Sequence, residues 1–234
     1  MRNYDDGAII LVGDDEVAMR HVLNAQLSAR GHSVYEAGTG ADVLRTVSEL
    51  EPDVILLDLG LPDIDGIEVT RRLRRSVQTP IIILSVHAME SDKIAALDAG
   101  ADDYLTKPCD LGELLDRIGI ALRRVALQDA QVFTAGDLVV DLNRQMVQVA
   151  NSPVWLTAME YDLLKVLVFN AGRLLTQRRL AQEVWGEKSE DNALQLLRTT
   201  ITTLRQKLDS DGSHPGHIAT EPGVGYRLRI ATSI

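Results

Sequence analysis

The chain has 234 residues, of which 45% are hydrophobic and 25% charged, a composition typical of a folded globular protein and not of a disordered one. The N-terminus lacks the basic and apolar regions of a signal peptide, and no apolar run approaches the roughly 18 residues of a membrane span. The single cysteine, Cys109, excludes an intrachain disulfide, so we expect a cytoplasmic protein without membrane insertion.

The formal net charge of -10 is unevenly distributed. Residues 1–124 contain 13 Lys and Arg against 22 Asp and Glu, whereas residues 125–234 contain 11 against 12. The second half is therefore close to neutral. It is not a strongly basic domain, but it could present a local basic face to nucleic acid.

Short apolar runs alternate with amphipathic segments through the first 124 residues. Strands are predicted near residues 8–12, 33–36, 54–57, 80–84 and 103–105, and helices near 16–30, 41–50, 67–75, 91–98 and 111–124. Five strands that alternate with five helices predict a parallel, doubly wound α/β sheet with helices on both faces. Residues 125–131 are unpatterned and are predicted to be a linker.

Residues 132–234 have a different pattern, which predicts a second domain of the α+β class. Short strands are expected at 138–141, 145–149 and 153–155, helices at about 158–171, 177–184 and 192–208, and a closing β-hairpin from 217–221 and 226–230. The first of these helices begins with a capping box, Thr157 and Glu160. The helix at 192–208 places one apolar stripe toward a core and leaves a polar face outward.

Charged and hydroxyl side chains follow four strands of the predicted parallel sheet. Asp14, Asp15 and Asp58 come from two strand ends, and Ser85 and Lys107 from two others. Because the carboxyl ends of parallel strands share one edge, these groups can converge there. Clustered carboxylates repel one another without a cation, and oxygen ligands favour Mg²⁺. With Mg²⁺ and Lys107 present, Asp58 is the best candidate for a nucleophile that accepts a phosphoryl group.

These residues, together with Tyr104 and Pro108, resemble the receiver domain of bacterial two-component response regulators. Four stretches of the second half, 156–160 (LTAME), 184–186 (VWG), 204–208 (LRQKL) and 223–227 (GVGYR), resemble the winged helix-turn-helix effector of the OmpR/PhoB class. The two resemblances cover nearly the whole chain. Residues 57–62 and 91–106 are especially similar to regulators of potassium-transport genes within that class.

The resemblance implies a transcription regulator and not an enzyme. Asp58 is implied to be phosphorylated by a sensor histidine kinase, with self-phosphoryl transfer and slow autodephosphorylation as the only reactions. Asp15, Asp58 and the backbone carbonyl of Gly60 are implied to be the Mg²⁺ ligands, and Asp14 is implied to act through water.

The resemblance also assigns the remaining residues of the receiver. Lys107 is implied to pair with the phosphoryl group, and Ser85 and Tyr104 to form a switch in which the ring fills space that the hydroxyl vacates. Three residues depart from the family pattern, and one of them is Cys109, which replaces the usual Phe after Lys107 and Pro108. Gly13 replaces a larger apolar residue and is expected to loosen its strand end. Val86 replaces Ala or Gly beside the phosphoryl pocket and is expected to slow phosphoryl entry.

Phosphorylation is expected to strengthen a homodimer through the face formed by the fourth helix, fifth strand and fifth helix. The residues expected on this face are Lys93, Ile94, Leu97, Asp98, Asp102, Asp103, Glu113, Leu115, Arg117 and Arg124. The dimer is expected to bind tandem half-sites in double-stranded promoter DNA, with RNA polymerase as a further candidate partner. DNA contacts are expected from Arg178, Arg179, Arg198, Thr199, Thr202, Thr203 and Arg205, and from Arg227 in the hairpin.

Two alternatives remain open at this point. A Mg²⁺-dependent phosphohydrolase could also use Asp58 as nucleophile, but it would need a second acid two residues later, where the chain has Gly60. A phosphorylation-independent dimeric DNA-binding regulator would keep both domains and dispense with the phosphate. The departures at Gly13 and Val86 favour this second alternative more than the first.

Overall fold

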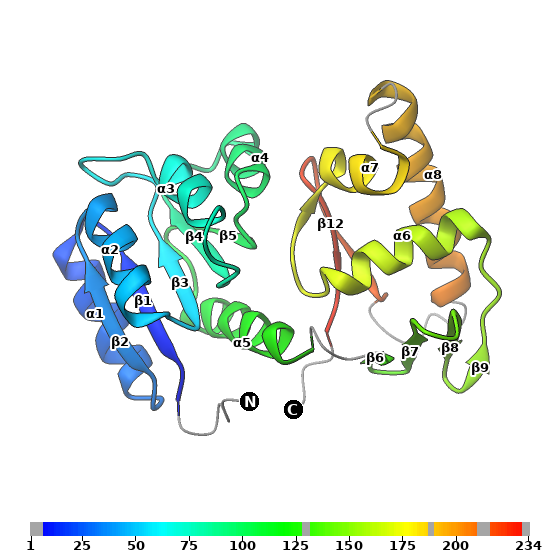
Figure 1. Cartoon of the computed structure of the whole chain (residues 1–234), viewed down its shortest axis with the longest axis horizontal. Helices are drawn as coiled ribbons and strands as arrows, with labels where there is room; N and C mark the ends of the chain where they lie inside the picture. The colour runs from blue at the N-terminus through cyan, green and yellow to red at the C-terminus, as the bar shows by residue number, and fades with distance from the viewer. Residues whose placement is uncertain (1–6, 128–131, 187–189, 210–215, 231–234) are drawn as a thin grey trace. The chain divides into compact units, whose positions relative to one another are not determined.

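The structure is a computed structural model that describes residues 7–127, 132–186, 190–209 and 216–230 (Figure 1). The chain divides into two compact units, Met1–Leu122 and Arg123–Ile234. Within the described ranges, no helix combines the length and apolar character needed to cross a bilayer.

The first unit is a five-stranded parallel sheet with the strand order β2-β1-β3-β4-β5. Its strands are β1 (Ile9–Gly13), β2 (Ser33–Ala37), β3 (Val54–Leu57), β4 (Ile81–Ser85) and β5 (Asp103–Thr106). The helices between and after them are α1 (Val17–Ser28), α2 (Gly40–Leu50), α3 (Gly66–Leu73), α4 (Glu90–Asp98) and α5 (Leu111–Leu127). The predicted (βα)5 fold is confirmed.

One boundary of this unit differs from the prediction. Helix α5 continues to Leu127, so residues 125–127 belong to the helix and not to the linker. The rest of the predicted linker, residues 128–131, lies outside the described residues. The apolar residues Val125 and Leu127 are compatible with continued helix, and the sequence offers no capping glycine or proline at residue 124 to end it.

The sheet is buried on both faces. Ile10, Val12 and Leu56 point to the face that is covered by apolar residues of α1 and α5, among them Leu27 and Ile118. All four residues of β3 are buried, as expected for a central parallel strand whose second face is also covered. This packing fixes the register in which Gly13 at the end of β1 lies beside Leu57 at the end of β3. The residues that follow these strands, Asp14 and Asp58, therefore emerge at the same edge.

Gly13 does not loosen the end of β1. A Cβ at this glycine would lie 2.6 Å from Val43 Cγ2 and 3.1 Å from Leu57 Cδ1, so a neighbouring helix already occupies the space. The strand end is also hydrogen-bonded on both sides, from Asp58 N to Gly13 O at 2.7 Å and from Asp14 N to Ala37 O at 3.0 Å. The expectation of a loose strand end is wrong, because Val43 of α2 packs where the family's larger side chain would lie.

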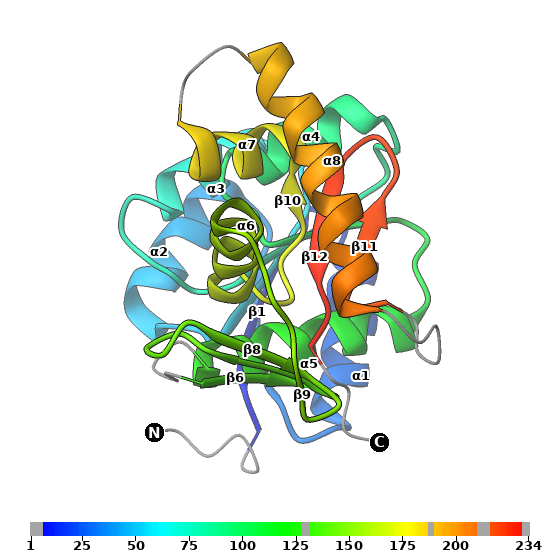
Figure 2. The same cartoon turned by 90° about the vertical axis from the view of Figure 1, so that its right-hand side faces the viewer.

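The second unit combines two antiparallel sheets with three helices (Figure 2). The four-stranded sheet contains β6 (Val132–Ala135), β7 (Leu138–Asp141), β8 (Met146–Val149) and β9 (Ser152–Pro153). The helices are α6 (Ala158–Phe169), α7 (Gln177–Trp185) and α8 (Glu190–Leu208), and the three-stranded sheet contains β10 (Leu175–Thr176), β11 (Ile218–Glu221) and β12 (Gly225–Leu228) in the order β10-β12-β11. This is the expected arrangement of helices followed by a hairpin.

Two strands of the second unit were not predicted. β6 alternates exposed and buried residues, a period-2 signal that the sequence does contain. β10 is only two residues long and exists because Leu175 and Thr176 pair with Tyr226 and Gly225 of β12. A pairing this short leaves no periodicity in the sequence, so only the three-dimensional structure reveals it.

The capping box at the start of α6 is present as predicted. Thr157 Oγ1 accepts a hydrogen bond from Glu160 N at 3.4 Å, and Glu160 Oε2 accepts one from Thr157 N at 2.8 Å. Glu160 is buried and also receives Lys207 Nζ of α8 at 2.6 Å. Burial raises the pKa of Glu160, but the hydrogen bonds from Lys207 and Thr157 outweigh it, and the net pKa is lowered. The start of α6 is thereby fastened to the end of α8.

Candidate functional site

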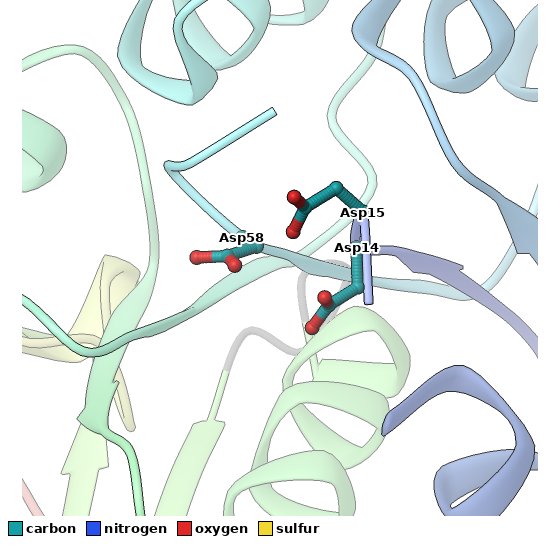
Figure 3. A group of neighbouring side chains, drawn as sticks. All are labelled: Asp14, Asp15 and Asp58. Carbon is teal, nitrogen blue, oxygen red and sulfur yellow. The ribbon is translucent and has the colours of Figure 1, made fainter. Parts of the chain in front are cut away.

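Three carboxylates converge at the edge of the sheet where β1 and β3 end (Figure 3). Asp14, Asp15 and Asp58 each offer one oxygen, and these oxygens lie within 4.8 Å of one another. Asp14 and Asp58 are buried, whereas Asp15 is exposed. The cluster is therefore embedded in the sheet edge and opens to solvent through Asp15.

Lys107 joins two of these carboxylates. Its Nζ donates to Asp14 Oδ2 at 2.6 Å and to Asp58 Oδ2 at 2.9 Å from the loop that follows β5. Burial lowers the pKa of Lys107, but the hydrogen bonds and charges of Asp14 and Asp58 outweigh it, so the net pKa is raised. The ammonium stays charged and reduces the repulsion between two carboxylates that it holds close together.

The donor set fits a hard divalent cation. One ammonium pairs with two of the three carboxylates, so net negative charge remains in a partly buried cluster of oxygen ligands in which Asp15 is exposed. Leu59 N donates to Asp58 Oδ1 at 2.7 Å and fixes the orientation of that carboxylate. Gly60 lies beside it, since a Cβ at Gly60 would be 3.8 Å from Asp58 Oδ2. A Mg²⁺ ion is compatible with these groups.

Ser85 and Tyr104 belong to one hydrogen-bonded group with His87. Ser85 Oγ accepts from His87 N at 3.2 Å, and Tyr104 Oη donates to His87 O at 2.6 Å. Burial raises the pKa of the Tyr104 phenol, while a hydrogen bond with Ser85 opposes the increase. Both side chains are buried, and the ring of Tyr104 already lies inward in this conformation. The hydroxyl and the ring that were predicted to act together are thus in contact.

The loop after β4 forms one rim of the edge that carries the cluster. Val86 is 68% exposed and Met89 is 63% exposed. His87 Nδ1 lies 3.9 Å from Asp92 Oδ2, at the outer limit of an ion pair. The branched side chain at position 86 is therefore mostly exposed to solvent.

Sequence reasoning missed Arg20, which lies beneath the acid pair. Its Nη1 donates to Asp14 O at 2.6 Å and to Asp15 O at 3.2 Å. The available signal was its spacing, because an arginine in the second turn of a helix can reach back to the loop that precedes that helix. An arginine side chain on a helix can also extend into solvent, so its spacing from the acid pair did not by itself predict this contact.

The structure corrects three members of the predicted dimer face. Leu97 is 1%, Asp102 4% and Asp103 5% exposed, so none of them contributes surface in this conformation. Asp102 is paired with Arg74 inside the unit, and Asp103 lies 3.5 Å from Arg117. Leu97 lies in α4, Asp103 in β5 and Asp102 in the connection between them, and the sequence could not show that neighbouring groups of the same unit cover them.

The remaining residues of that face have mixed exposure. Asp98 and Glu113 are exposed, and the residues that are half-buried are Lys93, Ile94, Leu115 and Arg117. Lys93 Nζ lies 5.9 Å from the centroid of the Tyr104 ring, a cation–π distance. The side chain of Arg124 lies outside the described part of the chain. A contact thus connects the predicted dimer face with the predicted switch residue.

Helix α8 presents part of the predicted DNA-binding set outward. Arg198, Thr199 and Thr202 are exposed, and both threonine hydroxyls donate to the carbonyl four residues earlier. Arg198 Nε donates to Gln177 Oε1 at 3.1 Å, which ties α8 to the start of α7. Arg178 of α7 is also exposed. These four residues, from two helices, form what we call the outward polar set.

Two arginines of the predicted DNA-binding set are bound within the unit in this structure. Arg205 donates through Nη2 to Ile218 O at 2.7 Å and to Thr220 Oγ1 at 2.6 Å, so it fastens α8 to the hairpin. Arg227 is 7% exposed and donates to Gly172 O at 2.8 Å. Both guanidiniums donate to backbone carbonyls within the unit.

Two further members of the predicted set are less available than expected. Arg179 is half-buried and pairs with Glu183 at 3.0 Å. Thr203 is half-buried, and its hydroxyl donates to Thr200 O at 3.1 Å. A phosphate contact by Arg179 would require it to leave the Glu183 carboxylate or to share its donors.

Comparison with known proteins identifies both units. Residues 10–119 match the family "Response regulator receiver domain", and residues 151–228 match the family "Transcriptional regulatory protein, C terminal". The chain is 45% identical to the KDP operon transcriptional regulatory protein KdpE of Escherichia coli strain K12, over 94% of this chain and 99% of that protein. It is 42% identical to the transcriptional regulatory protein KdpE of Mycobacterium tuberculosis strain H37Rv, over 94% of this chain and 98% of that protein.

Among solved structures, the chain is similar to the response regulator DrrB, a Thermotoga maritima OmpR/PhoB homolog. The sequence identity is 28%, the TM-score is 0.49, and the match covers 95% of this chain and 99% of that one. The matches to KdpE extend over both units, and the buried acid cluster lies within the part that matches the receiver family. The chain belongs to the OmpR/PhoB family of two-component response regulators and is a KdpE-like member of it.

Proposed function

We propose that Asp58 is the phosphoacceptor of a Mg²⁺-dependent switch that controls transcription. The observation that carries the proposal is the placement of Asp58: it is buried at the end of β3, within ligand distance of two further carboxylates, and hydrogen-bonded to Lys107. Mg²⁺ held by Asp14, Asp15 and Asp58 would neutralise the charge of an incoming phosphoryl group. The histidine kinase partner that the family implies would supply that group.

The transfer step needs only the residues of the acid cluster, Mg²⁺ and the phosphohistidine of the kinase. A carboxylate oxygen of Asp58 attacks the phosphorus, a P–O bond forms, and the P–N bond to the imidazole breaks. The electron pair of the broken bond stays on the imidazole nitrogen, which takes up a proton. Lys107 is already hydrogen-bonded to Asp58 and can hold a phosphoryl oxygen, because its raised pKa keeps it charged.

Conversion of the phosphate into a signal is assigned to Ser85 and Tyr104. Ser85 is hydrogen-bonded to His87 and Tyr104 in this conformation, and a phosphoryl group on Asp58 would offer its hydroxyl a charged acceptor instead. Tyr104 would then lose one partner of its group while it remains beneath Lys93 of α4. This sequence of contacts supports a phosphorylation-strengthened dimer on the α4–β5–α5 face, formed by its exposed and half-buried members.

The output is proposed to be binding of tandem half-sites in promoter DNA through α8. The outward polar set supplies two arginines and two threonines, which suit phosphate oxygens and base edges in a major groove. The relatives named KdpE support an operon for potassium transport as the target. RNA polymerase remains a candidate partner of the bound dimer.

The test is incubation with Mg²⁺ and acetyl phosphate, followed by mass spectrometry of the intact protein. We expect a stable gain of one phosphoryl group in the natural chain and none in Asp58→Asn. Asp65→Asn is the matched control, because it makes the same isosteric change in the following loop and Asn can still cap α3. Continuous release of phosphate without a stable adduct would favour a phosphohydrolase. The absence of any adduct, with DNA binding intact, would favour a phosphorylation-independent regulator.

A further inference from the structure

Arg20 binds the backbone of the acid pair of the receiver. It lies in α1, and its Nη1 donates to the backbone carbonyls of Asp14 at 2.6 Å and Asp15 at 3.2 Å. The Arg20 side chain is 15% exposed, so it is held against the protein and not extended into solvent. Arg20 binds the main chain of the acid pair, so the carboxylates of Asp14 and Asp15 are not occupied by its guanidinium.

A second set of contacts fixes the guanidinium itself. Arg20 Nε lies 3.4 Å from Glu36 Oε2 of β2, an ion-pair distance that does not meet hydrogen-bond geometry, and Glu36 Oε1 accepts a hydrogen bond from Asn24 Nδ2 at 2.7 Å. The guanidinium also packs beside the loop after β2, since a Cβ at Gly38 would lie at an ordinary van der Waals distance of 3.4 Å from Arg20 Nη1. The guanidinium thus lies against β2 and the loop after it, and its ion-pair partner Glu36 is itself held by Asn24 of α1.

These contacts hold the β1–α1 turn, which is the shortest strand-to-helix connection in the site. Only the residues between Gly13 and Val17 join β1 to α1, and Glu16 N donates to Asp14 Oδ1 at 2.9 Å. When Arg20 holds the carbonyls of Asp14 and Asp15 on one side of this turn, the orientation of both residues is restricted. The two carboxylates then keep the directions that bring them within 4.8 Å of Asp58.

We propose that Arg20 is a positioning residue for the divalent-cation site, and that Glu36 holds Arg20 in place for this role. The inference rests on the proposed function, since it concerns the Mg²⁺ that the phosphoryl transfer needs. Groups that orient the ligands of a metal, without touching the metal, commonly change its affinity by about 10- to 100-fold when they are removed. Lysine is only a partial substitute, because it lacks the planar fork that lets one guanidinium reach two carbonyls and a carboxylate.

The experiment measures cation binding directly. Mg²⁺ is titrated calorimetrically, and Mn²⁺ by water-proton relaxation, into the natural chain, Arg20→Met, Arg20→Lys, Glu36→Gln and the control Arg30→Met. Arg30 is a suitable control because it is exposed just after the end of α1 and donates to Gln26 O at 2.8 Å, away from the acid pair. We expect Kd to rise about tenfold in Arg20→Met, less in Arg20→Lys and Glu36→Gln, and not at all in Arg30→Met.

A kinetic measurement separates positioning from a loss of the acceptor itself. With acetyl phosphate as donor, Arg20→Met should need about tenfold more Mg²⁺ for half-maximal phosphorylation, while the rate at saturating Mg²⁺ stays close to that of the natural chain. The double variant Arg20→Met with Glu36→Gln should need no more Mg²⁺ for half-maximal phosphorylation than Arg20→Met alone, because Glu36 acts through Arg20.

The outcomes distinguish this inference from the proposed function. Unchanged cation affinity in folded Arg20→Met overturns the role of Arg20. If that variant does not fold, as judged by circular dichroism, unchanged affinity in both Arg20→Lys and Glu36→Gln overturns it instead. If the natural chain neither binds Mg²⁺ nor gains a phosphoryl group, the proposed function fails and the inference fails with it.

Discussion

Lys107 is the residue on which the chemistry of the acid cluster depends. It places one ammonium between Asp14 and Asp58, two buried carboxylates that would otherwise repel each other. A phosphoryl group on Asp58 would add further negative charge beside the same ammonium. Lys107 can therefore bind an oxygen of the phosphoryl group from its present position, without a large movement of its side chain.

Val86 gives a prediction at the residue scale. Its side chain is 68% exposed at the rim of the acid cluster, where a smaller residue would leave a wider approach. We expect Val86→Ala to speed phosphorylation by acetyl phosphate about threefold, equivalent to a barrier lowered by about 0.7 kcal/mol. The rate is measured as adduct formation by mass spectrometry, at a Mg²⁺ concentration that saturates the natural chain.

The control for Val86 is Met89→Ala, a truncation in the same loop that is 63% exposed and three residues further from Ser85. Equal acceleration by both variants would point to general loosening of the loop. Identical rates in the natural chain and Val86→Ala would remove the steric role.

At this scale the sequence predicted which residues gather but not which side chains turn inward. Asp14, Asp58 and Lys107 could be placed because strand ends can be recognised and parallel strands share an edge. The contacts that Arg205 and Arg227 make within the unit were not predicted, because a residue on the polar side of a helix or strand can still be covered by a third element. Their carbonyl partners, in β11 and in the loop after α6, are far away in sequence.

Among the elements of the second unit, α6 and α8 are linked by an ion pair that also caps α6. Glu160 closes the capping box with Thr157 and binds Lys207 Nζ at 2.6 Å. The Glu160 side chain is 7% exposed and that of Lys207 is 35% exposed. The pair is therefore partly shielded from solvent, and it connects the first turn of one helix to the last turn of another.

This pair predicts a pH dependence of stability. The folded pKa of Glu160 is lowered from 4.5, so its contribution is fully present above about pH 4.5 and is lost as pH falls through the lower folded value. We expect Glu160→Gln to reduce the free energy of unfolding by about 1 kcal/mol at pH 7. The difference between the two proteins should shrink below pH 4.5 and vanish once both carry a neutral side chain.

The measurement for Glu160 is urea unfolding followed at several pH values, with Glu183→Gln as the control. Glu183 pairs with Arg179 on the more exposed surface of α7, and its removal should have a smaller effect at every pH. A destabilisation of the Glu160 variant that stays constant down to pH 3 would contradict the assignment.

At the element scale, most of the architecture could be predicted from the sequence. The (βα)5 alternation and the start of α6 follow from local periodicity and capping chemistry, which a short window contains. The end of α5 and the strand β10 do not, because the first lacks a stop signal and the second depends on pairing with β12. Elements that arise only from long-range pairing cannot be seen in the local pattern.

For the whole molecule, the unequal charge of the two halves sets the expected behaviour on DNA. Residues 1–124 carry nine more acidic than basic residues, and residues 125–234 only one more. Non-specific attraction to the phosphate backbone should therefore be weak, and most affinity should come from two copies that bind neighbouring half-sites.

The salt dependence of DNA binding tests this expectation. Arg178→Ala removes one cation of the outward polar set from each copy, so the slope of log K against log salt should become smaller by about 2 for a dimer. Arg144→Ala is the control, since Arg144 lies in the β7–β8 turn and is not part of that set. The slopes are obtained from fluorescence anisotropy of a labelled tandem site. Equal slopes for the natural chain and Arg178→Ala would exclude a phosphate contact by Arg178.

The contact between Gly13 and Val43 has a consequence for anyone who redesigns this molecule. The two positions share one small volume next to the acid pair, so they behave as a single packing unit that is split between a strand and a helix. Enlarging the glycine alone would push α2 away from the sheet and disturb the turn that carries the acids. A larger residue at position 13 would fit only if Val43 were replaced by a smaller residue at the same time. Residues 13 and 43 would therefore have to be exchanged together when a segment of a relative is introduced.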